Sequence, residues 1–185
     1  MRLIRSFLLV LLVMGFAAFI SRKFTTGHKS EAKGSIYDFK ILALNGDVID
    51  FSAYKGKTLL IVNTASKCGF TPQYADLEKI HDNYSDKVVV LGFPANNFLW
   101  QEPGTNDEIA TFCQKNYGVS FQMFEKISVK GKDKHPLYQW LEAKTGKTPT
   151  WNFCKFVVSK DGQEVKFFSS KVTPLDKEIV DTFGH

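Results

Sequence analysis

The chain has 185 residues, an ordinary globular composition and a formal net charge of +5. Residues 1–34 contain six of the 24 basic residues but only one of the 19 acidic residues, so residues 35–185 are electrically neutral. A neutral domain releases few counterions on a phosphate backbone, which argues against a nucleic-acid-binding protein. The length is sufficient for one domain with a hydrophobic core and a terminal extension.

The N-terminal residues have the pattern of a leader. Arg2 and Arg5 precede an uncharged, mostly apolar run over residues 6–21. This order is typical of an export signal, but no clear cleavage site follows, and the run approaches the roughly 20 residues that span a bilayer. Residues 1–21 are therefore either a signal peptide or an uncleaved signal anchor, and polar residues 22–34 predict a linker. Both hypotheses place the domain outside the cytoplasm, periplasmic, secreted or membrane-anchored.

The domain predicted over residues 35–185 opens with a β-hairpin. Residues 39–44 alternate weakly between apolar and polar side chains, and Asn45-Gly46 is typical of a two-residue hairpin turn. Residues 48–51 continue as the return strand.

A parallel β-α-β unit is predicted next. Residues 58–62 and 88–93 are continuous apolar runs, typical of strands that are covered on both faces. Between them, Thr71 is predicted as an N-cap and Pro72 as the first residue of a helix that continues to Tyr84.

The same criteria predict helices over 106–117, 135–144 and 174–183, and strands over 123–129, 153–158 and 165–168. A parallel unit followed by an antiparallel hairpin and a last helix predicts a thioredoxin-like α/β fold, with a mixed central sheet flanked by helices.

The cysteine pattern excludes several classes of protein. Cys68, Cys113 and Cys154 are too few for a disulfide scaffold, and no two of them form a CxxC motif. The histidines are not spaced with them as zinc ligands, so we expect no metal.

Cys68 is the candidate nucleophile. It follows the first buried strand and precedes the helix that Pro72 opens, where α/β sheets form their sites. Free backbone N–H groups, the helix dipole and the adjacent Lys67 all favour the thiolate, which is the reactive form of cysteine. The alternative is a small, buried apolar thiol.

Two further segments supply uncharged hydrogen-bond donors. Residues 93–104, which include Gln101, follow the next parallel strand and emerge at the same end of the sheet as Cys68. Trp151-Asn152 precedes the antiparallel hairpin. Amide and indole N–H groups can stabilise a thiolate and a developing alkoxide, although each residue alone is more typical of a core tryptophan or a surface amide.

Three segments together resemble the signature segments of the glutathione peroxidase family: Asn63 to Thr71, Phe93 to Phe98 with Gln101-Glu-Pro-Gly104, and Trp151 to Phe153. The resemblance implies a thioredoxin-like fold, hydroperoxide reduction without a cofactor, and a catalytic tetrad of Cys68, Gln101, Trp151 and Asn152. The peroxidatic residue is then a cysteine, which peroxide oxidises to a sulfenic acid.

The resemblance also implies a recycling route. In cysteine-type members a second cysteine of the chain condenses with the sulfenic acid, and thioredoxin reduces the disulfide. Cys113 is the candidate resolving cysteine, and Cys154 is either a buried bystander or an alternative partner. The sequence has no Arg after Arg22 to clamp glutathione carboxylates, so a thioredoxin-like reductant is favoured over glutathione. The short stretch before Trp151 is similar to monomeric members, whose open site could admit lipid hydroperoxides.

Two other functions stay open. An extracytoplasmic thiol–disulfide oxidoreductase would fit the leader and the fold, but it needs a CxxC motif, and Thr71 occupies the fourth position here. A thioredoxin-fold peroxide sensor would use the same cysteine chemistry without sustained turnover.

Overall fold

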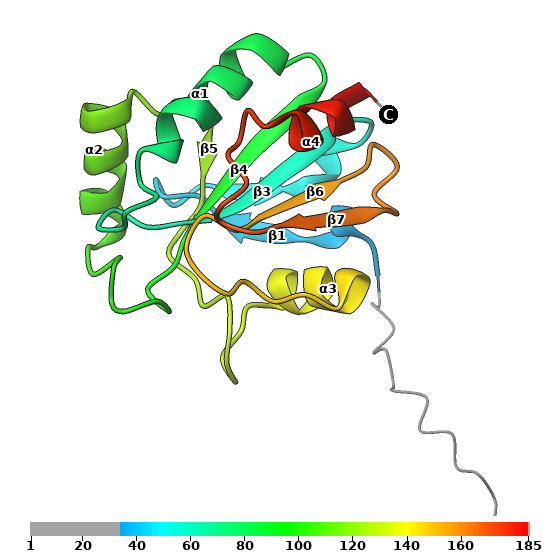
Figure 1. The fold of residues 1–185 in the computed structure, drawn as a ribbon. Coiled ribbons are helices and arrows are strands. Elements are labelled where there is room, and N and C mark those ends of the chain that lie inside the picture. Colours follow the sequence, from blue (N-terminus) through cyan, green and yellow to red (C-terminus); the bar gives the residue numbers. More distant parts are fainter. Residues whose placement is uncertain (1–33, 185) are drawn as a thin grey trace, which may run out of the picture.

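The computed structural model describes residues 34–184 (Figure 1). The predicted leader and residues 22–33 of the predicted linker lie outside this range. No helix in residues 34–184 is both long and apolar enough to cross a bilayer.

A five-stranded mixed sheet forms the centre of the domain, in the order β5-β4-β3-β6-β7. The strands are β3 (Thr58–Thr64), β4 (Val88–Pro94), β5 (Gln122–Met123), β6 (Lys155–Val158) and β7 (Val165–Phe168). β3, β4 and β5 are parallel, and β6 and β7 are antiparallel to their neighbours. The predicted mixed sheet is confirmed.

Helices cover both faces of the sheet (Figure 1). On one face lie α1 (Gln73–Tyr84), α2 (Asn106–Tyr117) and the short α4 (Lys177–Val180). On the other lie α3 (Pro136–Thr145) and the predicted hairpin, formed by β1 (Lys40–Leu42) and β2 (Val48–Asp50).

β3 explains why the sheet is buried on both sides. All seven of its residues are buried, and its side chains alternate between the two cores. Leu59 and Ile61 pack into the core under α3 and the hairpin, whereas Leu60 and Val62 pack into the core under α1 and α2. The unbroken apolar run in the sequence is therefore a strand with two apolar faces.

The largest differences from the predicted bounds fall in three elements. β5 ends at Met123, because the amides that follow bond to different partners: Glu125 donates to Leu42 of the hairpin and Ile127 to Pro94 of β4. β6 begins only at Lys155. The last helix is shorter than predicted and continues as a 3₁₀ turn over Asp181–Gly184.

Candidate active site

The loop after β3 holds Cys68 in a tight turn. The Cys68 backbone N–H donates to Thr71 Oγ1 at 3.0 Å, and the Thr71 hydroxyl donates to the Ala65 carbonyl at 2.9 Å. The Thr71 N–H in turn donates to the Cys68 carbonyl at 3.0 Å. Thr71 is thus not the predicted N-cap of α1, because its side chain closes the cysteine loop instead.

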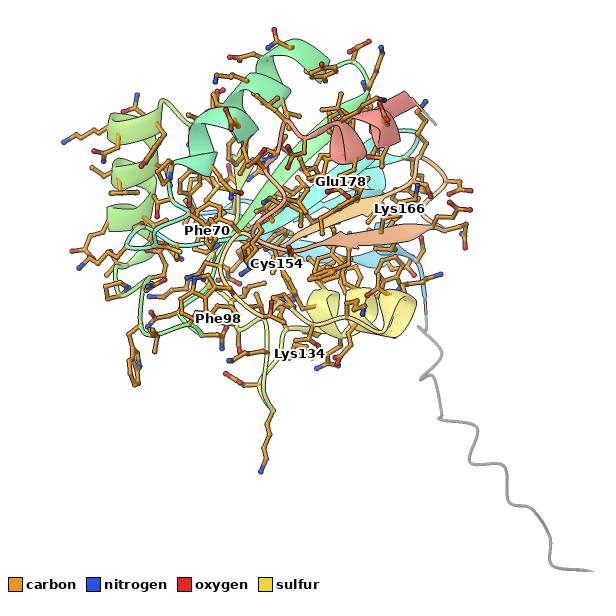
Figure 2. All side chains as sticks on the ribbon, viewed as in Figure 1. Phe70, Phe98, Lys134, Cys154, Lys166 and Glu178 are labelled. Atoms are coloured by element: carbon orange, nitrogen blue, oxygen red, sulfur yellow. The ribbon has the colours of Figure 1, made fainter. Side chains whose placement is uncertain are left out.

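The sulfur of Cys68 is half-buried and receives a backbone hydrogen bond. The Phe70 N–H donates to Cys68 Sγ at 3.4 Å. Gly69 is exposed, and an added Cβ there would meet no atom within 4 Å, so the approach to this loop is open. Figure 2 places Phe70 at the same end of the molecule as Phe98, with Lys166 of β7 at the opposite end.

The loop after β4 brings Gln101 to the cysteine loop. The Lys67 N–H donates to the Gln101 carbonyl at 3.0 Å. Asn152 Nδ2 donates to Gln101 Oε1 at 2.9 Å, and Asn152 is completely buried. Because Oε1 accepts this bond, the Nε2 end of the Gln101 amide is left to donate elsewhere.

Asn63, at the end of β3, fixes the Trp151–Cys154 segment. Asn63 Nδ2 donates to the Trp151 carbonyl at 2.9 Å, and the Phe153 N–H donates to the Asn63 carbonyl at 2.6 Å. Phe153 has a left-handed backbone, with φ of 64°. The Trp151 ring packs on Phe98, with 5.7 Å between centroids.

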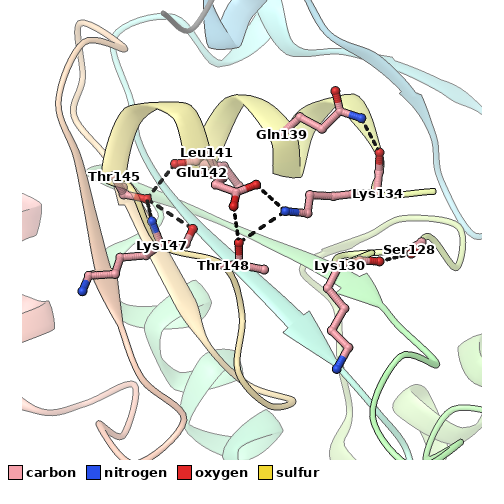
Figure 3. A network of polar contacts seen from close by, with 9 residues as sticks. All are labelled: Ser128, Lys130, Lys134, Gln139, Leu141, Glu142, Thr145, Lys147 and Thr148. Carbon is pink, nitrogen blue, oxygen red and sulfur yellow. Dashed lines mark hydrogen bonds and ion pairs between the residues drawn. The ribbon is translucent and has the colours of Figure 1, made fainter. Parts of the chain in front are cut away.

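A polar network holds the chain that leads to Trp151 (Figure 3). Lys134 forms an ion pair with Glu142 of α3, and Thr148 Oγ1 donates to the same carboxylate at 2.7 Å. The bond from Lys134, aided by that from Thr148, lowers the pKa of Glu142. The loop after α3 is therefore tied to the helix before it reaches the site.

The structure thus brings most of the predicted residues together. Gln101 and Asn152 are hydrogen-bonded, Lys67 joins them to the cysteine loop, and Trp151 packs on the same loop as Gln101. Within residues 34–184, no hydrogen bond joins Cys68 Sγ to Gln101, Trp151 or Asn152.

Cys113 is a free thiol on the buried side of α2, with 2% of its surface exposed. Burial raises the pKa of this thiol to about 11, an effect that the neighbouring Tyr74 hydroxyl opposes. Cys113 belongs to the same core against which Cys68 packs. It is protonated at neutral pH and shielded by the helix that carries it.

Cys154 is a free, completely buried thiol. Its Sγ lies 3.4 Å from Ser170 Oγ. Strand alternation does not relate its side chain to that of Asn152, because Phe153 between them has the left-handed backbone and β6 starts later.

A cavity of about 430 Å³ lies between the cysteine loop, the Gln101 loop and α2. Lys67, Glu102 and Phe112 are among its lining residues. Glu102 is 1% exposed, and burial raises the pKa of its carboxyl, an effect that Ser66 and the nearby Lys126 and Lys67 oppose.

Sequence reasoning placed Asn63 and Thr71 in the signature segment around Cys68 but assigned neither its hydrogen-bonding role, and it missed the buried Lys155. Lys155 Nζ donates to Gln73 Oε1 and to the Val172 carbonyl, both at 2.5 Å, and so ties the first turn of α1 to the C-terminal segment. A lysine between Cys154 and Phe156 in an apolar strand was the available signal, because a charge there breaks an otherwise buried run.

A free, half-buried cysteine beside the central strand of a thioredoxin-like sheet, next to a hydrogen-bonded pair of amide side chains, defines a thiol-dependent oxidoreductase. The profile of the glutathione peroxidase family matches residues 36–142. The chain belongs to this family, and it is a thiol peroxidase.

Two curated relatives illustrate the match. The chain is 50% identical over 149 residues to a glutathione peroxidase of Lactococcus lactis subsp. cremoris, covering 78% of this chain and 95% of the relative. It is 42% identical over 156 residues to a hydroperoxy fatty acid reductase of Synechocystis sp., covering 78% and 92%. These relatives do not favour a thiol–disulfide oxidoreductase.

Solved structures also match this chain in sequence and fold. The apo crystal structure of Trgpx is 36% identical, with a TM-score of 0.64, and the match covers 82% of this chain and 97% of that one. The structure of T. cruzi GPX1 is 32% identical, with a TM-score of 0.63 and the same coverage. The thioredoxin-like fold is thereby confirmed.

Proposed function

We propose that Cys68 is the peroxidatic residue and that Gln101, Trp151 and Asn152 assist it. The observation that carries this proposal is the Asn152–Gln101 hydrogen bond beside the cysteine loop. It directs the Gln101 Nε2 donors away from Asn152, so that they can serve a reacting oxygen. The Phe70 N–H already faces the sulfur.

In the proposed reaction the Cys68 thiolate attacks the terminal oxygen of a hydroperoxide. The O–O bond breaks, and its electron pair leaves with the second oxygen, which takes up a proton to give water or an alcohol. The sulfur becomes a sulfenic acid. Neutral N–H donors stabilise the negative charge as it moves from sulfur to oxygen.

Cys113 then resolves the sulfenic acid. Its sulfur bonds to Cys68 and displaces the hydroxyl as water, which leaves a disulfide for an external dithiol to reduce. Because Cys113 lies on the buried side of α2, this step requires part of that helix to open.

The proposed reductant is a thioredoxin-like protein, with glutathione as the weaker donor. The yeast relative named glutathione peroxidase-like peroxiredoxin 2, 47% identical over 153 residues, supports a peroxiredoxin-like cycle. The name of the Synechocystis relative supports fatty acid hydroperoxides as substrates beside hydrogen peroxide. We further propose that the protein acts as a monomer outside the cytoplasm.

Three cysteine variants test the cycle. Cys68→Ser should abolish hydrogen peroxide consumption. Cys113→Ser should allow one equivalent of peroxide to react and then stall with reduced thioredoxin, whereas Cys154→Ser is the matched buried-thiol control and should turn over normally.

Mass spectrometry of the oxidised wild-type protein should reveal a Cys68–Cys113 disulfide. A Cys68–Cys154 disulfide would overturn the assignment of Cys113, and sustained turnover by Cys68→Ser would overturn the proposed function itself.

A further inference from the structure

Two large apolar side chains project into solvent immediately before Gln101. Leu99 is 69% exposed and Trp100 is 77% exposed. Both have left-handed backbones, with φ of 50° and 52°. Residues other than glycine rarely adopt this conformation, and two in succession need a loop that enforces it.

The residues on either side of this pair, Phe98 and Gln101, hold it in this conformation. The Gln101 N–H donates to the Phe98 carbonyl at 3.2 Å, which closes a turn around Leu99 and Trp100. Phe98 is buried, packs on Trp151 and anchors the turn in the core. The two apolar side chains are thus held outward by a rigid base.

Lysine residues stand in the segments that contact this turn, the tip of the loop. Lys130 Nζ lies 4.7 Å from the centre of the Phe98 ring, and the exposed Lys67 is hydrogen-bonded through its backbone to Gln101. Lys132 follows in the same exposed loop as Lys130, in which Asp133 is the acidic residue.

The loop that carries Lys130 is fixed to the tip by Asn97. Asn97 Oδ1 accepts the Val129 N–H at 2.8 Å, and Asn97 Nδ2 donates to Ser128 Oγ at 3.0 Å. The apolar pair and its basic surroundings therefore form one structural unit.

We propose that Leu99 and Trp100 insert into the interface of an anionic lipid bilayer. Tryptophan is enriched at membrane interfaces, and lysines nearby are attracted to anionic headgroups. Gln101 follows directly, so insertion brings the candidate active site to the membrane surface. The consequence for lipid hydroperoxides rests on the proposed function, whereas the membrane contact itself does not.

A protein partner fits the tip less well. A stable protein interface buries about 800 Å² on each partner, with aromatic residues seated in pockets. Here two side chains stand on a projecting turn, a geometry that suits penetration of a soft surface.

Fluorescence quenching of Trp100 tests the membrane contact directly. The full chain is mixed with vesicles of phosphatidylglycerol and phosphatidylcholine that carry bromine on the upper acyl chains. Trp140 is nearly buried and Trp151 is partly buried, so most quenching should come from Trp100. We expect strong quenching in the wild-type protein and its loss in Trp100→Phe. Equal quenching in both proteins, or none in either, would overturn the proposal.

The double variant Leu99→Asn, Trp100→Asn tests the functional consequence. Asparagine tolerates the left-handed conformation, so the turn should persist without its apolar surface. The ratio of kcat/KM for a phospholipid hydroperoxide in these vesicles to that for hydrogen peroxide should fall at least about tenfold, because the variant lacks the apolar surface that Leu99 and Trp100 would place in the bilayer. Val48→Asn is the matched control, since Val48 is 64% exposed on β2, and it should keep the wild-type ratio.

Two outcomes separate the proposals. If the double variant turns over hydrogen peroxide poorly with reduced thioredoxin and the wild-type Trp100 is not quenched, the tip contacts the reductant, and the membrane proposal is wrong. If the wild-type protein consumes no hydroperoxide but Trp100 is quenched, the proposed function fails and the membrane contact stands.

Discussion

At the scale of single residues, the hydrogen bond between Asn152 and Gln101 determines how the Gln101 amide is oriented beside the cysteine loop. Asn152 is completely buried, and the backbone groups of its two neighbours, Trp151 and Phe153, are hydrogen-bonded to Asn63. Asn152 therefore imposes one orientation on the Gln101 amide. An amide that rotated freely would offer its oxygen to the reacting peroxide half of the time.

Asn152→Ala should consequently lower kcat/KM for hydrogen peroxide by about tenfold to a hundredfold, less than the roughly hundredfold to thousandfold loss on removing a donor, because Gln101 remains and loses only its fixed orientation. Stopped-flow measurement of peroxide reduction checks this. Asn116→Ala, at an exposed site on α2, is the matched control and should behave as wild type. A change of less than twofold in Asn152→Ala would show that the amide pair has no role in catalysis.

Lys155 gives the domain a pH-dependent stability. Burial lowers the pKa of its ammonium group to about 8 in the folded protein, whereas a lysine in an unfolded chain titrates near about 10.4. Between these values the unfolded chain holds the proton more tightly, so the stability of the fold rises as pH rises through this window. Below pH 8 both states are protonated, and the cost of the buried charge is fully present.

Urea unfolding at pH 7.5 and pH 9.5 should therefore show a gain for the wild-type protein that exceeds the gain for Lys155→Met by about 2 kcal/mol. Other titrating groups, such as Cys113 and Tyr74, are common to both proteins and cancel in the comparison. Identical pH dependence in the two proteins would mean that Lys155 keeps its ordinary proton affinity.

At the scale of elements, β4 and β5 meet at a glycine for a steric reason. Gly92 pairs with Met123, and a Cβ at Gly92 would lie 2.2 Å from Met123 Sδ and 3.1 Å from Phe121 Cε2. The short edge strand can lie close to β4 only because residue 92 has no side chain.

Gly92→Ala should cost about 1–3 kcal/mol of unfolding free energy, as overpacked cores do. Adding Met123→Ala should make room, so the double variant should lose less than the sum of the two single changes. Gly69→Ala is the control for stability, because nothing lies within 4 Å of its added Cβ. Additive losses would indicate that the close contact is relieved in another way.

The sequence predicted most elements because their apolar patterns match what is buried. The α2 bounds at 106–117 and the β7 bounds at 165–168 are confirmed. The failures occur where backbone geometry departs from regular repeats: Phe153 is left-handed, and the chain after Met123 shares its hydrogen bonds between two elements. The periodicity of apolar residues indicates neither the left-handed backbone of Phe153 nor the change of hydrogen-bond partners after Met123.

The candidate site was predictable for a different reason. Cys68, Gln101 and Asn152 stand in motifs that are recognisable as a set, and the sheet places them at one end. Thr71 and Asn63 could not be assigned, because their roles are hydrogen bonds to backbone groups that only the folded loops bring within reach.

At the scale of the whole molecule, the beginning of the domain and the candidate site lie at opposite ends of the sheet. Ser35 caps the first 3₁₀ turn, Ile36–Asp38, and the Tyr37 hydroxyl donates to the Lys160 carbonyl at 2.7 Å. Lys160 follows β6, whose last residue pairs with the start of β3, whereas Cys68 follows the end of β3. The residue at which the described domain begins is therefore far from the cysteine loop along the sheet.

Removal of residues 2–33 should therefore leave kcat/KM for hydrogen peroxide within about twofold of that of the full chain, because no part of the candidate site is lost. If residues 1–21 form a signal anchor, the same deletion should move the protein from the membrane fraction to the soluble fraction. A tenfold loss of activity on hydrogen peroxide would show that the leader contributes to the site.

The cavity lined by Lys67 offers a place at which a ligand could stop the proposed catalytic cycle after its first step. It is bounded by the cysteine loop on one side and by Phe112 of α2 on the other. In the proposed cycle α2 has to open before Cys113 can reach Cys68, so a small molecule bound in this cavity should oppose that opening. Such an inhibitor should leave the reaction of Cys68 with the first peroxide molecule unchanged but block formation of the disulfide. The protein would then accumulate in its sulfenic acid form and would not turn over.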